Sequence, residues 1–214
     1  MIITVFATKS STKTSIAVSI SVYLKNNGYD VLLADLDEQS SASDWLDYRS
    51  ENVNLKQIVS VKKNGKNVAR DLIELAMKYN YVVCDCGGKD YLAGRLSLLA
   101  ADVALVPIFP TNLSLLTLES SLSAIRDAKN FNEKLMVFIV ITGVNSNILV
   151  KDTQEARDLI NEMISDMDYC VLTENCITTR KIWSDITPLG LGITESSNNK
   201  AVDQFEKLMK EIIK

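Results

Sequence analysis

The sequence predicts a doubly wound α/β fold, in which one mostly parallel β-sheet carries helices on both faces. Short apolar runs rich in β-branched residues alternate with segments of helical periodicity along all 214 residues. The strand-like runs are apolar at consecutive positions, which is typical of parallel strands buried on both faces. No repeat, low-complexity tract or linker interrupts this alternation, so residues 1–214 are expected to form a single domain.

The first half of the chain alternates strands and helices most clearly. The helix that follows the first strand ends at Asn26-Asn27-Gly28, where asparagine and glycine favour a helix C-terminus. In the next helix, Trp45 falls on the side expected to face the core. The expected elements are strands at residues 2–6, 29–36, 57–61 and 81–85, and helices at residues 16–25, 41–48 and 68–78.

The second half continues the same pattern. Its first strand closes at Pro107 and Pro110, because proline cannot donate a hydrogen bond to a central ladder. The last helix gathers its apolar side chains on one stripe, which favours packing on the sheet over a membrane anchor. This stripe consists of Ala201, Phe205, Leu208, Met209 and Ile212. The expected elements are strands at residues 103–108, 134–141 and 169–172, and helices at residues 91–100, 113–129, 152–167 and 200–213.

Composition excludes several kinds of chemistry. The sequence contains no histidine, which rules out Ser-His-Asp and Cys-His catalysis and any metal site built on histidine. A net charge of −4 argues against a general nucleic-acid binder but leaves room for a local basic patch. No segment has the pattern of a signal peptide or a membrane-spanning helix, so we expect a cytoplasmic protein without membrane insertion.

The cysteines do not form a recognisable metal or redox motif. Cys84 and Cys86 lie two positions apart in an apolar run, and Cys170 and Cys176 are distant from them in sequence. A zinc knuckle uses C-x-x-C spacing, and cysteines of cytoplasmic proteins mostly behave as small core residues. We therefore expect these thiols to be structural.

Residues 9–15, Lys-Ser-Ser-Thr-Lys-Thr-Ser, join the first strand to its helix and contain two lysines but no glycine. A usual phosphate-binding loop, G-x-x-x-x-G-K-[ST], relies on glycine so that backbone N–H groups can wrap around phosphate oxygens. The hydroxyl groups of residues 10–12 either replace some of those contacts or cap the helix. The lysines either bind phosphate or are solvated charges around an inactive site.

Three acidic residues stand at the ends of two predicted strands. Asp35 and Asp37 close the second strand, and Asp85 closes the fourth. In doubly wound folds, ligands bind at the carboxyl ends of the strands, where residues 9–15 also lie. Carboxylates suit Mg²⁺ and an attacking water, while lysines and a helix N-terminus suit phosphate oxygens. The sequence therefore predicts one phosphate and magnesium site at this edge.

Together these motifs resemble the ParA/MinD family of deviant P-loop ATPases, especially its short ParA-type plasmid and chromosome partition proteins. That family's loop reads K-G-G-x-G-K-[ST], which Lys9 and Lys13-Thr14 match, whereas Ser10-Ser11 replace two residues and the loop is one residue shorter. Residues 31–39 resemble the family's V-L-L-x-D-x-D-x-Q switch, and residues 81–90 its D-x-G-G-R-D Walker B segment. Residues 101–110 resemble its A-D-x-x-x-x-P strand and loop. The resemblance covers nearly the whole chain and implies a P-loop NTPase-like fold.

The resemblance also implies a role for each matched residue. Lys13 would contact the β- and γ-phosphates, Lys9 would reach across a nucleotide-sandwich dimer, and Asp37 would orient the attacking water; these are the implied catalytic residues. The implied nucleotide-binding residues are Ser10, Ser11, Thr12, Lys13, Thr14 and Ser15. The implied Mg²⁺ ligands are Thr14, Asp35 and Asp85, with Asp35 also supporting Asp37.

The function implied by the resemblance is that of a partition or positioning ATPase. Such a protein uses ATP/ADP and Mg²⁺, forms a homodimer on nucleotide binding, binds DNA non-specifically on the nucleoid, and hydrolyses ATP when a ParB-like adaptor stimulates it. Two alternatives stay open: a non-hydrolysing scaffold or regulator, and a small-molecule ligase of the dethiobiotin-synthetase kind. Several basic residues are candidates for DNA contact, although solvated helix faces explain them more simply. These are Arg126, Lys129, Arg157, Arg180 and Lys181.

Overall fold

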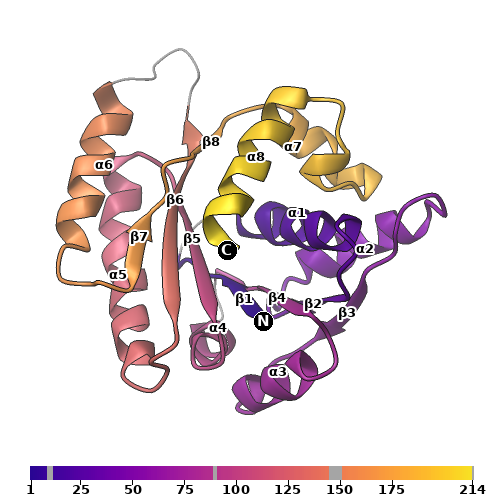
Figure 1. The fold of residues 1–214 in the computed structure, drawn as a ribbon, viewed down its shortest axis with the longest axis horizontal. Coiled ribbons are helices and arrows are strands. Elements are labelled where there is room, and N and C mark those ends of the chain that lie inside the picture. The colour runs from indigo at the N-terminus through magenta and orange to yellow at the C-terminus, as the bar shows by residue number, and fades with distance from the viewer. Residues whose placement is uncertain (9–11, 89–90, 145–150, 214) are drawn as a thin grey trace.

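A parallel β-sheet runs through the centre of the molecule (Figure 1). The computed structural model describes residues 1–8, 12–88, 91–144 and 151–213. The strands are β1 (Ile2–Val5), β2 (Val31–Asp35), β3 (Val59–Lys62), β4 (Tyr81–Asp85), β5 (Val103–Ile108), β6 (Met136–Val144), β7 (Cys170–Leu172) and β8 (Ile177–Thr178). Their order is β3-β2-β4-β1-β5-β6-β7, β8 pairs with β6, and each of these pairings is parallel. The predicted fold class is confirmed.

Helices cover both faces of this sheet. The α-helices are α1 (Lys13–Asn26), α2 (Ser41–Ser50), α3 (Val68–Ala76), α4 (Tyr91–Leu98), α5 (Asn112–Lys129), α6 (Lys151–Met163), α7 (Ile182–Asp185) and α8 (Asn199–Ile212). Two short 3₁₀ helices, η1 (Thr187–Leu189) and η2 (Ile193–Glu195), lie between α7 and α8. Buried side chains of α3 to α6 pack on one face, and those of α1, α2 and α8 on the other.

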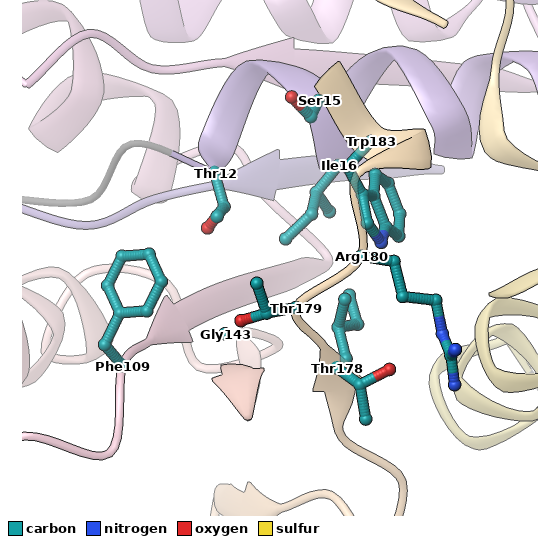
Figure 2. Close-up of a pocket in the computed structure, with 10 residues that line it drawn as sticks. Thr12, Ser15, Ile16, Phe109, Gly143, Thr178, Thr179, Arg180 and Trp183 are labelled. Carbon is teal, nitrogen blue, oxygen red and sulfur yellow. The ribbon is translucent and has the colours of Figure 1, made fainter. Parts of the chain in front are cut away.

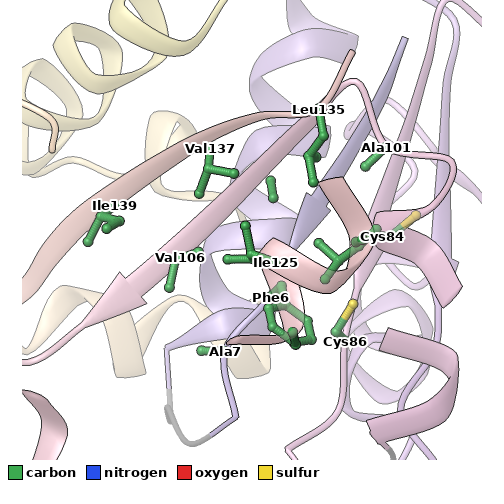
Figure 3. Packing of buried hydrophobic residues seen from close by; sticks show 14 of the residues in the cluster. Phe6, Ala7, Cys84, Cys86, Ala101, Val106, Ile125, Leu135, Val137 and Ile139 are labelled. Atoms are coloured by element: carbon green, nitrogen blue, oxygen red, sulfur yellow. The ribbon is translucent and has the colours of Figure 1, made fainter. Parts of the chain in front are cut away.

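Each strand divides its side chains between two cores, as the alternation of a β-strand requires. In β2, Leu32 and Ala34 face the α3–α6 side, whereas Val31 and Leu33 face the α1–α8 side. Figure 3 shows part of the first core, in which both thiols of the β4 end pack among aliphatic side chains. Cys84 and Cys86 are buried and unbridged, as predicted for structural cysteines.

The last helix belongs to the core. The apolar stripe of α8 is buried on the same side of the sheet as α1, and the Phe205 ring packs edge-on against Tyr23 and Trp183. The prediction that this stripe packs on the domain is confirmed. Within the described residues, no helix is both long enough and apolar enough to cross a membrane.

The structure differs from the predicted elements most clearly at two places, and it confirms one predicted helix C-terminus. Residues 13–15 were expected in the loop but form the first turn of α1, where the N–H of Ile16 donates to the Thr12 carbonyl at 3.0 Å. The predicted C-terminus of this helix is right: Gly28 has φ +91°, and the N–H of Tyr29 reaches back to the Leu24 carbonyl. Between residues 173 and 198, where no element was predicted, the chain forms β8, α7, η1 and η2.

Candidate functional site

The carboxyl ends of β1, β2 and β4 lie together and bring acidic residues to one edge. In the strand register, Asp35 is paired with Asp85, and Val5, the last residue of β1, also lies beside Asp85. Helix α1 begins at this edge, because the chain leaves β1 there and returns as a helix at Lys13. Lys9, Ser10 and Ser11, the first residues of the predicted phosphate loop, lie outside the described residues.

Lys13 is the first residue of α1, and its side chain is buried at this edge. Its Nζ lies close to the glycine turn after β4, since a Cβ built on Gly88 would be 3.6 Å away. Burial lowers the pKa of Lys13, and the charges of Asp85, Cys86 and Asp37 act in the opposite direction. The ammonium group of Lys13 therefore lies near the carboxyl groups of Asp85 and Asp37 at this edge.

Asp85 is buried at the end of β4, and neither of its carboxylate oxygens has a hydrogen-bond partner among the described residues. The Thr14 hydroxyl lies near enough to lower the pKa of Asp85, but without the geometry of a full hydrogen bond. Burial dominates and, with Asp35 and Asp37 nearby, raises the pKa of Asp85 to about 7. A buried carboxylate with unused oxygens is suited to a cation that arrives with a ligand.

Asp35 organises the loop between β2 and α2. One of its oxygens accepts the backbone N–H of Asp37 at 3.0 Å, and the other accepts the N–H and hydroxyl of Ser43 at 3.1 and 2.7 Å. These donors occupy both oxygens, so Asp35 holds the loop and the start of α2 together. Its predicted part in binding Mg²⁺ stays a prediction.

Asp37 is half-buried on this loop and faces the turn after β4. Its Oδ1 accepts the N–H of Gln39 at 3.0 Å, and a Cβ built on Gly87 would stand 2.5 Å from the same oxygen.

Ser40, three residues on, has φ +57°, a left-handed conformation that serine adopts only at a cost. Lys62 of β3 donates to the Ser40 hydroxyl and supports this conformation.

Thr8, just before the predicted phosphate loop, and Thr12, within it, are held in different ways. Thr8 is fixed to α5, with its N–H donating to the Ser121 hydroxyl at 3.2 Å and its own hydroxyl donating to the Thr117 carbonyl at 3.1 Å. Thr12 precedes α1, but its side chain makes no capping hydrogen bond, and no acidic residue lies in the first turn. The idea that hydroxyls cap this helix is therefore wrong for Thr12. The N-terminus of α1, like that of any helix, is positively polarised and attracts anions.

A mostly apolar cavity of about 150 Å³ opens beside the start of α1. Figure 2 shows the rings of Phe109 and Trp183 on opposite sides of it, with Ile16 between them. Gly143 has φ +69° and no room for a Cβ against the Phe109 ring, so a glycine here allows the ring to line the cavity. Arg180 also lines it, and its buried Nε has no hydrogen-bond partner among the described residues. A planar, partly polar group fits such surroundings.

The sequence did not identify this cavity. Phe109 follows the predicted strand at residues 103–108, and its position between two prolines was the available signal. Arg180 and Trp183 come from the segment in which no element was predicted, and Arg180 was considered only for DNA contact. The other four basic candidates make local contacts. These are Arg126 with Glu119, Lys129 with the Glu133 and Leu135 carbonyls, Arg157 with the Thr173 carbonyl, and Lys181 with Asp185.

The site residues fit a magnesium–nucleotide complex. Lys13, the N-terminus of α1 and the cavity offer places for phosphates and a planar base, and Asp85 offers unused oxygens beside Thr14. No cluster of three or more histidine, cysteine, aspartate or glutamate residues is found among the described residues. Mg²⁺ usually takes one or two protein oxygens together with phosphate oxygens and water, which matches the Thr14 hydroxyl and the Asp85 carboxylate.

Comparison with known proteins shows the family of this chain. The family model for the CobQ/CobB/MinD/ParA nucleotide binding domain matches residues 3–213. The chain belongs to this family. An uncharacterized protein of Methanocaldococcus jannaschii is 24% identical over 94% of the chain and 93% of its own length.

Solved structures of this family share the fold at low sequence identity. Apo McdA of Cyanothece superimposes with a TM-score of 0.79 at 12% identity and 98% coverage of both chains. A plasmid partition protein of Borrelia burgdorferi bound to AMPPNP gives a TM-score of 0.66 at 16% identity, covering 98% of this chain and 96% of that one. These likenesses show that the whole chain shares the fold of those proteins.

Proposed function

We propose that this chain is a ParA-like partition or positioning ATPase. The observation that carries the proposal is the convergence of Lys13, Asp37 and Asp85 at one edge of the sheet, with the start of α1 and an aromatic-lined cavity beside them. A family neighbour of the same fold is bound to AMPPNP, an ATP analogue, which supports ATP as the ligand.

Each residue of the edge has a task in this proposal. Lys13 neutralises the β- and γ-phosphates, and the Thr14 hydroxyl and Asp85 hold Mg²⁺, which supplies further neutralisation of the phosphates when bound. Asp37, held in place by Asp35 and Gly87, orients the attacking water. Phe109 and Trp183 enclose the base, and Arg180 lines the cavity beside them. Positioning and charge neutralisation are the main sources of rate in phosphoryl transfer.

The proposal includes a nucleotide-dependent homodimer that binds DNA non-specifically and is released when a ParB-like adaptor stimulates hydrolysis. Lys9 would reach the partner's phosphates across the dimer. Two leucines in the first turns of α5, Leu113 and Leu116, are each 74% exposed near the carboxyl edge of the sheet. Exposed apolar side chains at this place favour a second protein surface over bulk water.

Calorimetric titration of the protein with ATP and Mg²⁺ tests the binding step. The wild type is expected to bind with micromolar affinity, and Lys13→Ala is expected to weaken binding at least 50-fold. Lys25→Ala, at the far end of the same helix, is the matched control and should bind normally.

Sedimentation with ATP and with ADP tests the dimer, and DNA retention should weaken steeply as the salt concentration rises. An absence of ATP-dependent dimerisation, together with no effect of Lys9→Ala or Lys13→Ala, contradicts the proposal.

A second candidate is a non-hydrolysing scaffold or regulator of the same family. The lack of glycine in residues 9–15 favours it, because side chains there resist the backbone path of a usual phosphate loop. A phosphate-release assay distinguishes the two functions. A scaffold releases no phosphate with any adaptor, whether or not it binds nucleotide. Phosphate release that depends on Asp37 excludes the scaffold.

A further inference from the structure

The segment between β8 and α8 forms one wall of the cavity and is docked on α2. Trp183, on α7, lines the cavity, and its ring packs edge-on against Phe205 of α8. Beyond α7, the chain turns through η1 at Gly190 and through η2 at Glu195 before α8 begins. The position of the wall thus depends on what holds residues 190–195.

Arg49, near the end of α2, holds those residues. Its side chain is fully buried, yet every nitrogen of the guanidinium has an acceptor. Nη1 and Nη2 donate to the two carboxylate oxygens of Glu195, each at 2.9 Å. Nη1 also donates to the Gly190 carbonyl at 2.8 Å, and Nε and Nη2 donate to the Lys56 carbonyl at 2.9 and 2.8 Å. A fork-to-fork ion pair of this kind fixes orientation as well as distance.

The surrounding contacts leave little freedom for this junction. Gly190 lies so close to the Arg49 backbone that a Cβ would overlap it, and Gly190 has φ +62°. The indole N–H of Trp45 donates to the Leu191 carbonyl at 3.2 Å, and its ring lies 5.3 Å from the Arg49 guanidinium carbon. The N–H of Gly192 donates to Glu195 at 3.1 Å. Helix α2 and residues 190–195 therefore form one rigid unit.

The opposite end of α2 is tied to the carboxylate edge. Ser43, in its first turn, donates to Asp35 through both its N–H and its hydroxyl, and Asp35 in turn holds Asp37. Ten residues of helix span about 15 Å. One short helix thus connects the aspartates to the segment that carries the cavity wall.

We propose that Arg49 is a positioning residue for nucleoside recognition. Through Glu195 and Gly190, it holds the Trp183 wall at a fixed place relative to Asp35 and Asp37, so that a ligand with both a base and phosphates meets the two parts of the site at once. This inference rests on the proposed function, because it takes the cavity to be the nucleoside site. Residues that lock a binding wall in this way govern affinity without touching the ligand.

Two ligands separate positioning from a general structural role. ADP with Mg²⁺ occupies both the phosphate edge and the cavity, whereas inorganic tripolyphosphate with Mg²⁺ occupies the phosphate edge alone. Calorimetry of Arg49→Met should show ADP affinity reduced at least tenfold and tripolyphosphate affinity within twofold of wild type. Equal weakening of both ligands, or unchanged ADP affinity, overturns the proposal.

Matched variants control for charge and stability. Arg70→Met removes an exposed arginine, and Ile125→Ala removes buried volume from the opposite core; both should preserve the ratio of ADP to tripolyphosphate affinity. Because Arg49→Met leaves the Glu195 carboxylate without its main partner and risks misfolding, the double variant Arg49→Met/Glu195→Met is measured as well. It removes both charges together and should show the same selective loss of ADP affinity.

A ligand-free measurement distinguishes failure of this inference from failure of the proposed function. The chain contains two tryptophans, so ¹⁹F spectra of protein labelled with 5-fluorotryptophan show two resonances, which Trp183→Phe assigns. In the Arg49→Met/Glu195→Met variant the Trp183 resonance should shift and broaden, whereas in Ile125→Ala it should not. If the wild type binds neither ligand, the proposed function fails, and an unmoved Trp183 resonance overturns the positioning role independently.

Discussion

Gly87 lies directly against Asp37: a Cβ built on Gly87 would stand 2.5 Å from Oδ1 and 2.7 Å from Cγ of that carboxylate. The two residues come from different loops, one after β4 and the other after β2. Glycine is required here by the space that the neighbouring side chain occupies. The glycine turn after β4 thus fixes where Asp37 can stand.

Gly87→Ala is therefore expected to displace Asp37 and to lower the free energy of unfolding by about 1–3 kcal/mol, as overpacking does elsewhere. Urea denaturation measures this effect. Gly88→Ala is the control, because its Cβ would meet Lys13 Nζ at an ordinary 3.6 Å, and its stability should stay close to that of the wild type. Equal stabilities of the two variants would show that the Gly87 contact relaxes without cost.

Asp85 should make the magnesium-free protein less stable as the pH rises. Burial raises its pKa to about 7 in the folded state, whereas an unfolded aspartate titrates near about 3.9. The folded state therefore binds this proton more tightly, and stability falls between about pH 4 and pH 7 by up to about 4 kcal/mol.

Asp85→Asn should abolish this fall, so that the variant matches the wild type at pH 4 and exceeds it at pH 8 in denaturation curves. Asp71→Asn is a control of opposite sign. The hydrogen bond from Lys63 lowers the pKa of Asp71, so the ionised carboxylate stabilises the folded protein at pH values above the pKa of Asp71 in the unfolded state. A pH profile of Asp85→Asn that parallels the wild type would mean that Asp85 is ionised in the folded protein throughout this range.

Ser40 should respond to substitution as a left-handed position does. Its φ of +57° costs a β-branched residue most and glycine least. Ser40→Val is expected to lower the free energy of unfolding by about 2 kcal/mol, and Ser40→Gly to change it by less than about 1 kcal/mol. Thermal denaturation of both variants checks the order, and similar stabilities would indicate that the loop adopts another conformation.

Phe205→Ala should destabilise the protein strongly. The ring, which comes from α8, is fully buried against Tyr23 of α1 and Trp183 of α7. The expected loss is about 3–5 kcal/mol, measured by urea denaturation. Leu189→Ala, at a site 57% exposed, is the matched surface control. If the Phe205→Ala variant is as stable as the wild type but loses binding to lipid vesicles, α8 acts as a membrane anchor.

Much of the fold could be predicted because periodicity reports burial directly. Consecutive apolar residues in β2, β4 and β5 predicted two-faced strands, and the α8 stripe predicted a packed helix. The segment after β7 could not be predicted in this way. Its elements are two to four residues long, and Arg49, a charged residue from α2, supplies the contacts that hold it. Local pattern carries no signal for such a partner.

For the site, the sequence by itself determined which chemical groups are present and that they meet at one edge, because the strands of a doubly wound fold end at the edge where ligands bind. Only the tertiary structure decided how each group is used. Asp35 is engaged by Ser43 and the Asp37 backbone, Asp85 keeps its oxygens unused among the described residues, and Gly87 limits the position of Asp37. Those outcomes depend on burial and on distances between side chains from separate loops, and such quantities arise when the chain packs and are not written in the spacing of its residues.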